Sequence, residues 1–253
     1  MADILVLCYH GVSDTWPANM AIARADLEAQ VRQLLAREYR GDTFSSALGS
    51  RGRGRTLAVT FDDSLRSVYD LAFPLLRQLG IPGTVYVPTG FVGAGEPVGW
   101  PGVDGWLAGS HAHELLPMEI SHLEELADAG WEIGAHTHTH PRLPELGDAE
   151  LAEELDTSKE RLESVLDRPC RSVAFPYGAV DVRVARAASA AGFEYGAGLA
   201  GYENRVDPMR WPRINVNRGD SRRRFSFKVS PLSRRLRLAR AREALSSRLP
   251  RPD

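Results

Sequence analysis

The most informative segment of this chain is Leu57-Ala58-Val59-Thr60-Phe61-Asp62-Asp63-Ser64. Five apolar or β-branched residues run without a charge into two adjacent carboxylates. Such a run predicts a short strand buried on both faces, as in parallel sheets, that ends where the polar residues begin. Adjacent side chains leave a strand in different directions, so one carboxylate can bind a cation while the other faces a substrate.

A second strand end carries the sequence Trp131-Glu-Ile-Gly-Ala-His-Thr-His-Thr-His140. The apolar segment is followed by three histidines at alternate positions. His136 and His140 can reach one cation if the chain turns after the strand, and imidazole with carboxylate is a donor set that suits zinc. His138, between them, would point away from the metal. The alternative is a polar loop that binds no metal.

Apolar, β-branched segments alternate with helical patterns along the rest of the chain. The predicted strands are residues 3 to 9, 56 to 61, 83 to 88, 131 to 135, 171 to 175, 193 to 197 and 211 to 216. This alternation predicts parallel strands with helical crossovers, and we expect a distorted (β/α) barrel of about seven strands. The candidate site residues follow the ends of four strands: His10, the Asp62-Asp63 pair, His136 to His140, and Pro176-Tyr177. These ends meet at one edge, where such folds assemble their sites.

The charges divide the chain into two parts. Residues 221 to 253 carry 11 Lys and Arg against two acidic residues, whereas the net charge of the whole chain is −2. We therefore expect a barrel domain over residues 1–220 and a basic, helical tail over residues 221–253. The tail could contact an anionic membrane surface or be a solvated terminal helix; nucleic acid is not expected, because the body is acidic.

The N-terminal apolar run, Ile4 to Cys8, is too short for a signal peptide or a membrane span and has no basic residues before it. Cys8 and Cys170 are distant in sequence and are expected to be reduced, buried thiols. These features predict a cytoplasmic protein. With the basic tail, they lead to the hypothesis of peripheral contact with the inner face of the membrane.

Taken together, the two strand-end motifs resemble the NodB homology domain of polysaccharide deacetylases, carbohydrate esterase family four. The family pattern Thr-Phe-Asp-Asp-Gly corresponds to Thr60 to Ser64, with Ser64 in place of glycine, and the His-Ser/Thr-x-x-His pattern corresponds to His136 to His140. Further matches are an aromatic-lined Pro-Tyr-Gly turn, a Tyr-His pair and a closing strand, at Phe175 to Gly178, Tyr9 to Gly11 and Trp211 to Ile214. The resemblance spans about residues 3 to 217.

The resemblance implies that the protein removes the N-acetyl group of an amino sugar in a glycan or a lipid-linked saccharide. Asp63, His136 and His140 would bind one divalent metal ion, most often zinc, and Asp62 would take the proton of the attacking water. The backbone N–H of Tyr177 would stabilise the oxyanion, and Pro176 with Tyr177 would form one wall of the substrate groove.

Because of two departures from the family pattern, two of the family's catalytic roles have no matching residue in this sequence. Ala174 stands where many members have an arginine that orients the base, and no histidine follows His140 to protonate the leaving amine. His10, at the end of the first strand, is our candidate for that acid. Its alternative role is to line the pocket.

Two further residues are candidates for substrate binding. Arg213 lies on the last predicted strand, and Trp106 lies in the long loop from Val92 to Pro117, which is expected over the barrel mouth. Trp106, like Trp100 in the same loop, could stack on a sugar or pack a lid. Two other functions remain open: a catalytically silent glycan-binding protein, and a hydrolase of another amide or of sugar O-acetyl esters.

Overall fold

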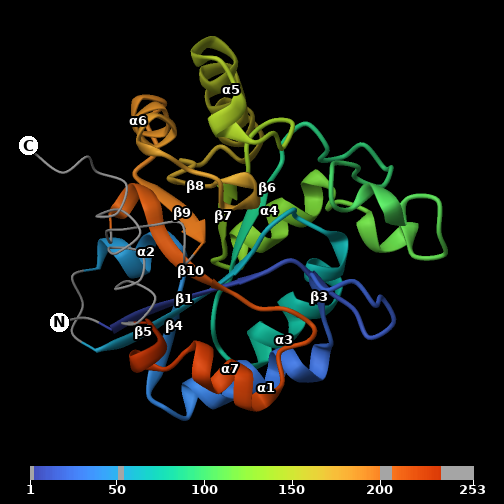
Figure 1. The fold of residues 1–253 in the computed structure, drawn as a ribbon, viewed down its shortest axis with the longest axis vertical. Coiled ribbons are helices and arrows are strands. Elements are labelled where there is room, and N and C mark those ends of the chain that lie inside the picture. The colour runs from blue at the N-terminus through green and yellow to red at the C-terminus, as the bar shows by residue number, and fades with distance from the viewer. Residues whose placement is uncertain (1–2, 51–53, 200–206, 235–253) are drawn as a thin grey trace, which may run out of the picture.

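The computed structural model describes residues 3–50, 54–199 and 207–234. Its central feature is a sheet of parallel strands that closes on itself (Figure 1). Seven strands form the closed barrel: β1 (Asp3–Tyr9), β5 (Arg55–Phe61), β6 (Thr84–Val87), β7 (Glu132–Ala135), β8 (Ser172–Ala174), β9 (Tyr195–Leu199) and β10 (Trp211–Asn215). The predicted seven-stranded barrel is thus confirmed, with β9 displaced by two residues from its predicted position.

Closure depends on β1, which pairs with β5 on one side and with β10 on the other. Leu7 is in register with Val59 of β5 and with Ile214 of β10. The first and last strands of the barrel are therefore neighbours, and residues more than 200 positions apart come together.

The barrel is distorted by an eighth strand, β4 (Tyr39–Asp42), which the sequence pattern does not predict. It pairs with the first half of β5, whereas β6 pairs with the end of β5 from Thr60 onward. Its sequence lacks an apolar run and contains Gly41. A Cβ at Gly41 would lie only 2.4 Å from the Cβ of Ile81, so any larger residue would collide with that side chain. This glycine is needed for close packing.

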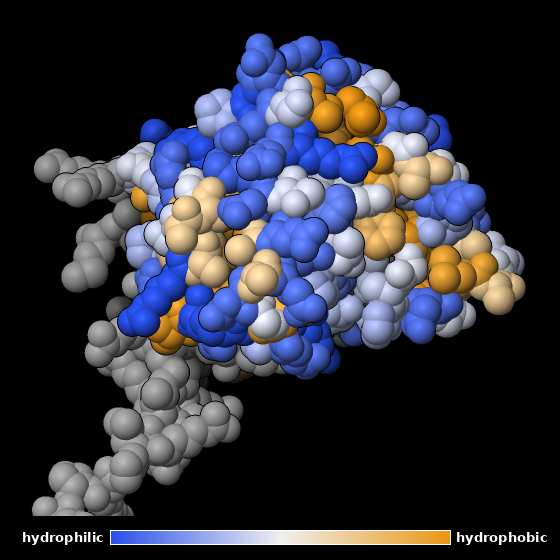
Figure 2. Space-filling model, turned by 90° about the horizontal axis from the view of Figure 1, so that it is seen from above, coloured by the Kyte–Doolittle hydropathy of each residue, from blue (hydrophilic) through white to orange (hydrophobic). Residues whose placement is uncertain are grey.

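Helices surround the strands (Figure 1). They are α1 (Arg24–Leu35), α2 (Phe44–Gly49), a π-helical segment (Val68–Ala72) continuing into α3 (Phe73–Gln78), α4 (Ile120–Asp128), α5 (Asp148–Leu166), α6 (Val182–Ala190) and α7 (Arg222–Lys228). The longer helices bury an apolar face, as α1 does with Leu27, Val31 and Leu34. The face seen in Figure 2 is mostly hydrophilic, with separate apolar patches. No helix among the described residues is both long and apolar enough to span a membrane.

The long loop at the barrel mouth has a small core of its own. Trp16, Leu65, Trp100 and Leu115 belong to a buried cluster separate from the main core. The short strands β2 (Gly11–Val12) and β3 (Ala21–Ile22) pair with each other and flank the N-terminal part of this cluster. The loop therefore packs as a fixed cap over one side of the C-terminal edge.

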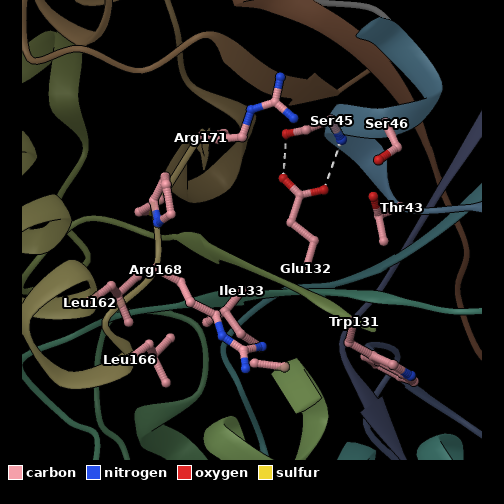
Figure 3. Close-up of a pocket in the computed structure, with 13 residues that line it drawn as sticks. Thr43, Ser45, Ser46, Trp131, Glu132, Ile133, Leu162, Leu166, Arg168 and Arg171 are labelled. Carbon is pink, nitrogen blue, oxygen red and sulfur yellow. Dashed lines mark hydrogen bonds between the residues drawn. The ribbon is translucent and has the colours of Figure 1, made fainter. Parts of the chain in front are cut away.

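The opposite, N-terminal edge of the barrel is held by Glu132 of β7 (Figure 3). Its carboxylate accepts hydrogen bonds from the backbone N–H of Ser45 at 2.7 Å, from the Ser45 hydroxyl, and from Ser172 Oγ at 2.6 Å. The adjacent cavity, about 130 Å³, is lined by residues that include Trp131, Leu162 and Arg168. Because Glu132 begins its strand, this cavity lies away from the edge where the candidate site residues gather.

The first part of the predicted tail packs against the barrel. Phe225 and Val229 are buried in the main core, and Arg234 donates to Asp3 Oδ1 at 2.6 Å. Residues that follow the predicted domain boundary at residue 221 therefore contact the barrel. Residues 235–253, the rest of the predicted tail, lie outside the described part of the chain.

Candidate active site

The carboxyl ends of β1, β5, β7 and β8 bring the predicted site residues together. Asp63, His136 and His140 form one group of possible metal ligands, and Asp62, His10 and Cys8 form a second group beside it. His138 belongs to neither group. Its Nδ1 lies 3.0 Å from the hydroxyl of Thr89. Both cysteines are free and buried, as predicted.

The geometry of the first group fits a metal ion. Asp63 Oδ1 lies 3.5 Å from Nε2 of His136 and 3.5 Å from Nε2 of His140. Ligands of a tetrahedral zinc ion, bound at about 2.1 Å, lie about 3.4 Å apart. The three side chains are nearly inaccessible, with exposed fractions of 3%, 1% and 5% for Asp63, His136 and His140. The donor set, its spacing and its burial therefore match a divalent cation site.

Neighbouring groups orient both histidines. His136 donates from Nδ1 to the carbonyl of Ala174 at 2.8 Å, which leaves its Nε2 lone pair free for a metal. His140 is held by packing: Trp100 stacks on its ring with centroids 4.1 Å apart, and Tyr177 meets it edge-on at 4.9 Å. Trp100, expected as a sugar platform or lid element, thus covers His140, a candidate metal ligand.

Burial sets the protonation of these ligands. It lowers the pKa of His136 to about 4 and also lowers that of His140, so both imidazoles are neutral at pH 7. Burial and the neighbouring charge of Asp62 raise the pKa of Asp63. A cation between the three ligands would offset that cost, because it favours the ionised carboxylate.

Asp62 is held by Arg213, on the last strand of the barrel. The guanidinium donates from Nη1 to Oδ1 at 2.6 Å and from Nη2 to Oδ2 at 2.8 Å, and the thiol of Cys8 lies 3.4 Å from Oδ2. Burial alone would raise the pKa of Asp62. The charge of Arg213, with smaller contributions from its hydrogen bonds and from nearby His136, outweighs burial and lowers this pKa below its ordinary value.

Arg213 was expected to bind the substrate, but its guanidinium binds Asp62 instead. The side chain is fully buried, and its remaining hydrogen bonds go to Thr60 Oγ1 and the carbonyl of Gly198. A guanidinium so enclosed faces Asp62 and not the surface. It reaches Asp62 because the barrel closes β10 against β1 beside β5.

His10 lies next to the base. One of its ring nitrogens is within 4.8 Å of both the Asp62 carboxylate and Cys8 Sγ. Burial lowers the pKa of His10, although the charge of Asp62 opposes the shift. Its Nδ1 is buried without a hydrogen-bond partner among the described residues. Cys8 was not predicted as a site residue, but its position two residues before His10 places it on the same side of the strand.

The remaining predicted residues form or support the rim. Pro176 is buried, whereas Tyr177 is half-buried, with a left-handed backbone at φ 59° and Arg142 5.0 Å above its ring. Trp106 is also half-buried and meets Trp16 edge-on at 5.8 Å. Tyr177 and Trp106 therefore retain partly accessible aromatic surface. Pro176 is part of the buried turn that carries Tyr177.

Comparison with known proteins agrees with this geometry. The family model described as polysaccharide deacetylase matches residues 49–196, more than half of the chain. The chain therefore belongs to the polysaccharide deacetylase family.

Individual relatives are more distant. The chain is 24% identical over 194 residues to the poly-β-1,6-N-acetyl-D-glucosamine N-deacetylase of Staphylococcus aureus (strain MSSA476), an alignment that covers 72% of this chain and 62% of that protein. The chain thus spans less than two thirds of the length of this relative.

Two solved structures share the fold. The Streptococcus pyogenes deacetylase PplD, determined in complex with acetate, has a TM-score of 0.75 at 20% identity and covers 90% of this chain and 98% of its own. IcaB from Ammonifex degensii has a TM-score of 0.69 at 23% identity and covers 95% of this chain and 99% of its own. At these identities the likeness establishes the fold.

Replacing Arg213 by methionine should lower the free energy of unfolding at pH 7 by about 3–5 kcal/mol, because it leaves a buried carboxylate unpaired. Urea denaturation of Arg213→Met, Asp62→Asn and the double variant measures this effect. We expect the double variant to lose less than the sum of the single losses. Arg171→Met, which breaks an exposed pair with Glu194, is the control and should cost less than about 1 kcal/mol. Additive losses would contradict the coupling.

Proposed function

We propose that this protein is a metal-dependent deacetylase that hydrolyses the N-acetyl group of an amino sugar in a glycan or lipid-linked saccharide and releases acetate. The observation that carries the proposal is the juxtaposition of Asp63, His136 and His140, spaced for one cation, with an arginine-held carboxylate at Asp62. Family membership supports it, as does the activity named for the staphylococcal relative.

Each residue of the site has a chemical task in this proposal. Asp63, His136 and His140 would hold the cation, which supplies Lewis acidity toward the acetyl carbonyl when bound; zinc suits one carboxylate and two imidazoles. Asp62 accepts the proton of the attacking water. Arg213 keeps Asp62 ionised and fixes its orientation, although the same charge makes it a weaker base.

The other half of the reaction needs a proton donor and an oxyanion partner. His10, beside Asp62, would protonate the leaving amine. The backbone N–H of Tyr177 would donate to the oxyanion from the left-handed turn after β8. The partly accessible rings of Tyr177 and Trp106 would contact the sugar.

Acetate release tests the function directly. The unaltered protein, with zinc present, should release acetate from β-1,6-linked N-acetylglucosamine oligomers or lipid-linked N-acetylglucosamine. Asp62→Asn should lower turnover by about 10²–10⁴-fold through loss of the base, and His136→Ala should lower both zinc content and turnover. Glu160→Gln, on the exposed side of α5, is the control for an acid-to-amide change and should leave both unchanged.

Other outcomes separate the alternatives. Bound zinc without release from any substrate, but with measurable glycan binding, would indicate a catalytically silent glycan-binding protein. Release from O-acetylated sugars or from other amides alone would assign the same site to that substrate class.

The pH profile tests His10 as the proton donor. A general acid must be protonated, so kcat/KM should fall as the pH rises through the pKa of His10. Because burial lowers this pKa from 6.5, the fall should begin at a lower pH than for an exposed imidazole. His10→Ala should lower kcat by about 10²–10⁴-fold and remove this limb of the profile. His113→Ala, at an exposed imidazole, is the control. Near-normal turnover of His10→Ala across the pH range would exclude the acid role.

We also propose that the start of the basic tail contacts an anionic membrane surface, which would place the enzyme at the inner face of the membrane near a lipid-linked substrate. Phe227 and Leu232 are 58% and 63% exposed, next to the exposed Arg222 and Arg223. Exposed apolar side chains beside cations suit an anionic interface, at about 1 kcal/mol per basic residue.

Sedimentation with phosphatidylglycerol vesicles at low salt tests this contact. Binding should fall at high salt, with phosphatidylcholine alone, and in a Phe227→Ser, Leu232→Ser double variant. Val182→Ser, which changes an exposed apolar residue on α6, is the matched control. Absence of binding to the anionic vesicles would remove the proposal.

A further inference from the structure

The loop that carries the two histidine ligands has an unfavourable backbone conformation. Thr137 and His140 both have φ of 65°, in the left-handed region that favours glycine. Such residues raise the energy of the backbone and persist where the surrounding structure holds them. The spacing of His136 and His140 therefore depends on contacts outside the loop.

One side of the loop is held by the chain that follows β6. The backbone N–H of Thr89 donates to the carbonyl of Thr137 at 3.1 Å, and that of Gly90 donates to the carbonyl of His138 at 2.8 Å. These contacts satisfy carbonyl groups only. The backbone N–H groups of His138 and Thr139 need acceptors on another side of the loop.

Glu154 of α5 is the acceptor on the other side. Its Oε2 accepts from the backbone N–H groups of both His138 and Thr139, each at 2.8 Å, and its Oε1 accepts from the hydroxyl of Thr139 at 2.5 Å. Successive N–H groups of this kind form a concave site for an anionic group. The carboxylate fills it directly between the two strained residues.

The position of Glu154 is itself rigid. It lies between Leu151 and Leu155, both of which are buried against the main core, near the middle of a 19-residue helix. Among the residues that the structure describes, its carboxylate makes no ion pair with a lysine or arginine. Its hydrogen bonds are therefore made to the loop between His136 and His140. Because α5 packs against the core, Glu154 holds that loop at a fixed position.

We propose that Glu154 is a positioning residue for the metal site: by binding the His138 and Thr139 amides, it holds His136 and His140 at the spacing that one cation requires. This inference rests on the proposed metal function. Glu154 touches neither ligand ring, so its effect passes through the backbone. Removing it should release the strain of the loop and let the two imidazoles separate before metal binds.

Zinc affinity of the protein, measured by chelator competition, tests the proposal. Glu154→Ala should weaken zinc binding by about 10–100-fold, the range typical of groups that support metal ligands. Glu154→Gln retains one acceptor oxygen and should weaken it less. Glu153→Ala changes the adjacent, exposed glutamate and should stay within about twofold of the unaltered protein. Saturating zinc should restore most of the turnover of Glu154→Ala, because the catalytic groups are intact.

Hydrogen exchange of the metal-free protein supplies a second readout. The amides of His138 and Thr139 should exchange faster in Glu154→Ala than in Glu153→Ala, whereas amides of the barrel strands should not change. Unaltered zinc affinity or unaltered exchange at these two amides overturns the inference while leaving the proposed function standing. If the unaltered protein binds no zinc at all, the metal function fails, and this inference fails with it.

Discussion

The buried ion pair between Arg213 and Asp62 is the interaction on which the site depends. It joins side chains that are 151 positions apart in sequence, at the end of β5 and on β10. Since an unpaired charge in this position would be costly, the carboxylate can remain ionised only when the last strand has closed the barrel. The same closure places Cys8 against the carboxylate and His10 beside it. The surroundings of Asp62 are therefore complete only when β10 has paired with β1.

Unfavourable backbone conformations cluster at the C-terminal edge of the barrel, where the candidate site lies. Asp63, Ser64, Thr137, His140 and Tyr177 all have positive φ, and all follow the ends of barrel strands at the site. Strand ends that turn sharply can aim several side chains at one point, but non-glycine residues in that geometry raise the backbone energy. Packing compensates: Trp100 covers His140, and the barrel-mouth loop that carries Trp100 is stabilised by its own apolar cluster. The loop thus supports the ligands as well as bounding the site.

Sequence patterns predicted the barrel and brought the candidate ligand residues to one edge of it, because both depend on local order. An uninterrupted apolar run such as Leu57 to Phe61 has few alternatives to a buried parallel strand, and a polar residue at its end lies on the edge where strands terminate. Strand β4 was missed for the complementary reason. Its Tyr-Arg-Gly-Asp sequence has no apolar run, and it forms a strand because β5 offers an unpaired edge and Ile81 requires a glycine opposite it.

By itself, then, the sequence determined the strand order along the chain and the grouping of Asp62, Asp63, His136 and His140 at one edge. Which groups support these residues depends on contacts that form when the barrel closes. Arg213 was expected to face the substrate and instead pairs with Asp62. Trp100 stacks on His140, and Glu154 accepts hydrogen bonds from the loop between His136 and His140. Periodicity shows which face of a strand or helix is buried, but a pairing between distant residues depends on strand register and barrel closure. Those are properties of the whole fold, which no local pattern contains.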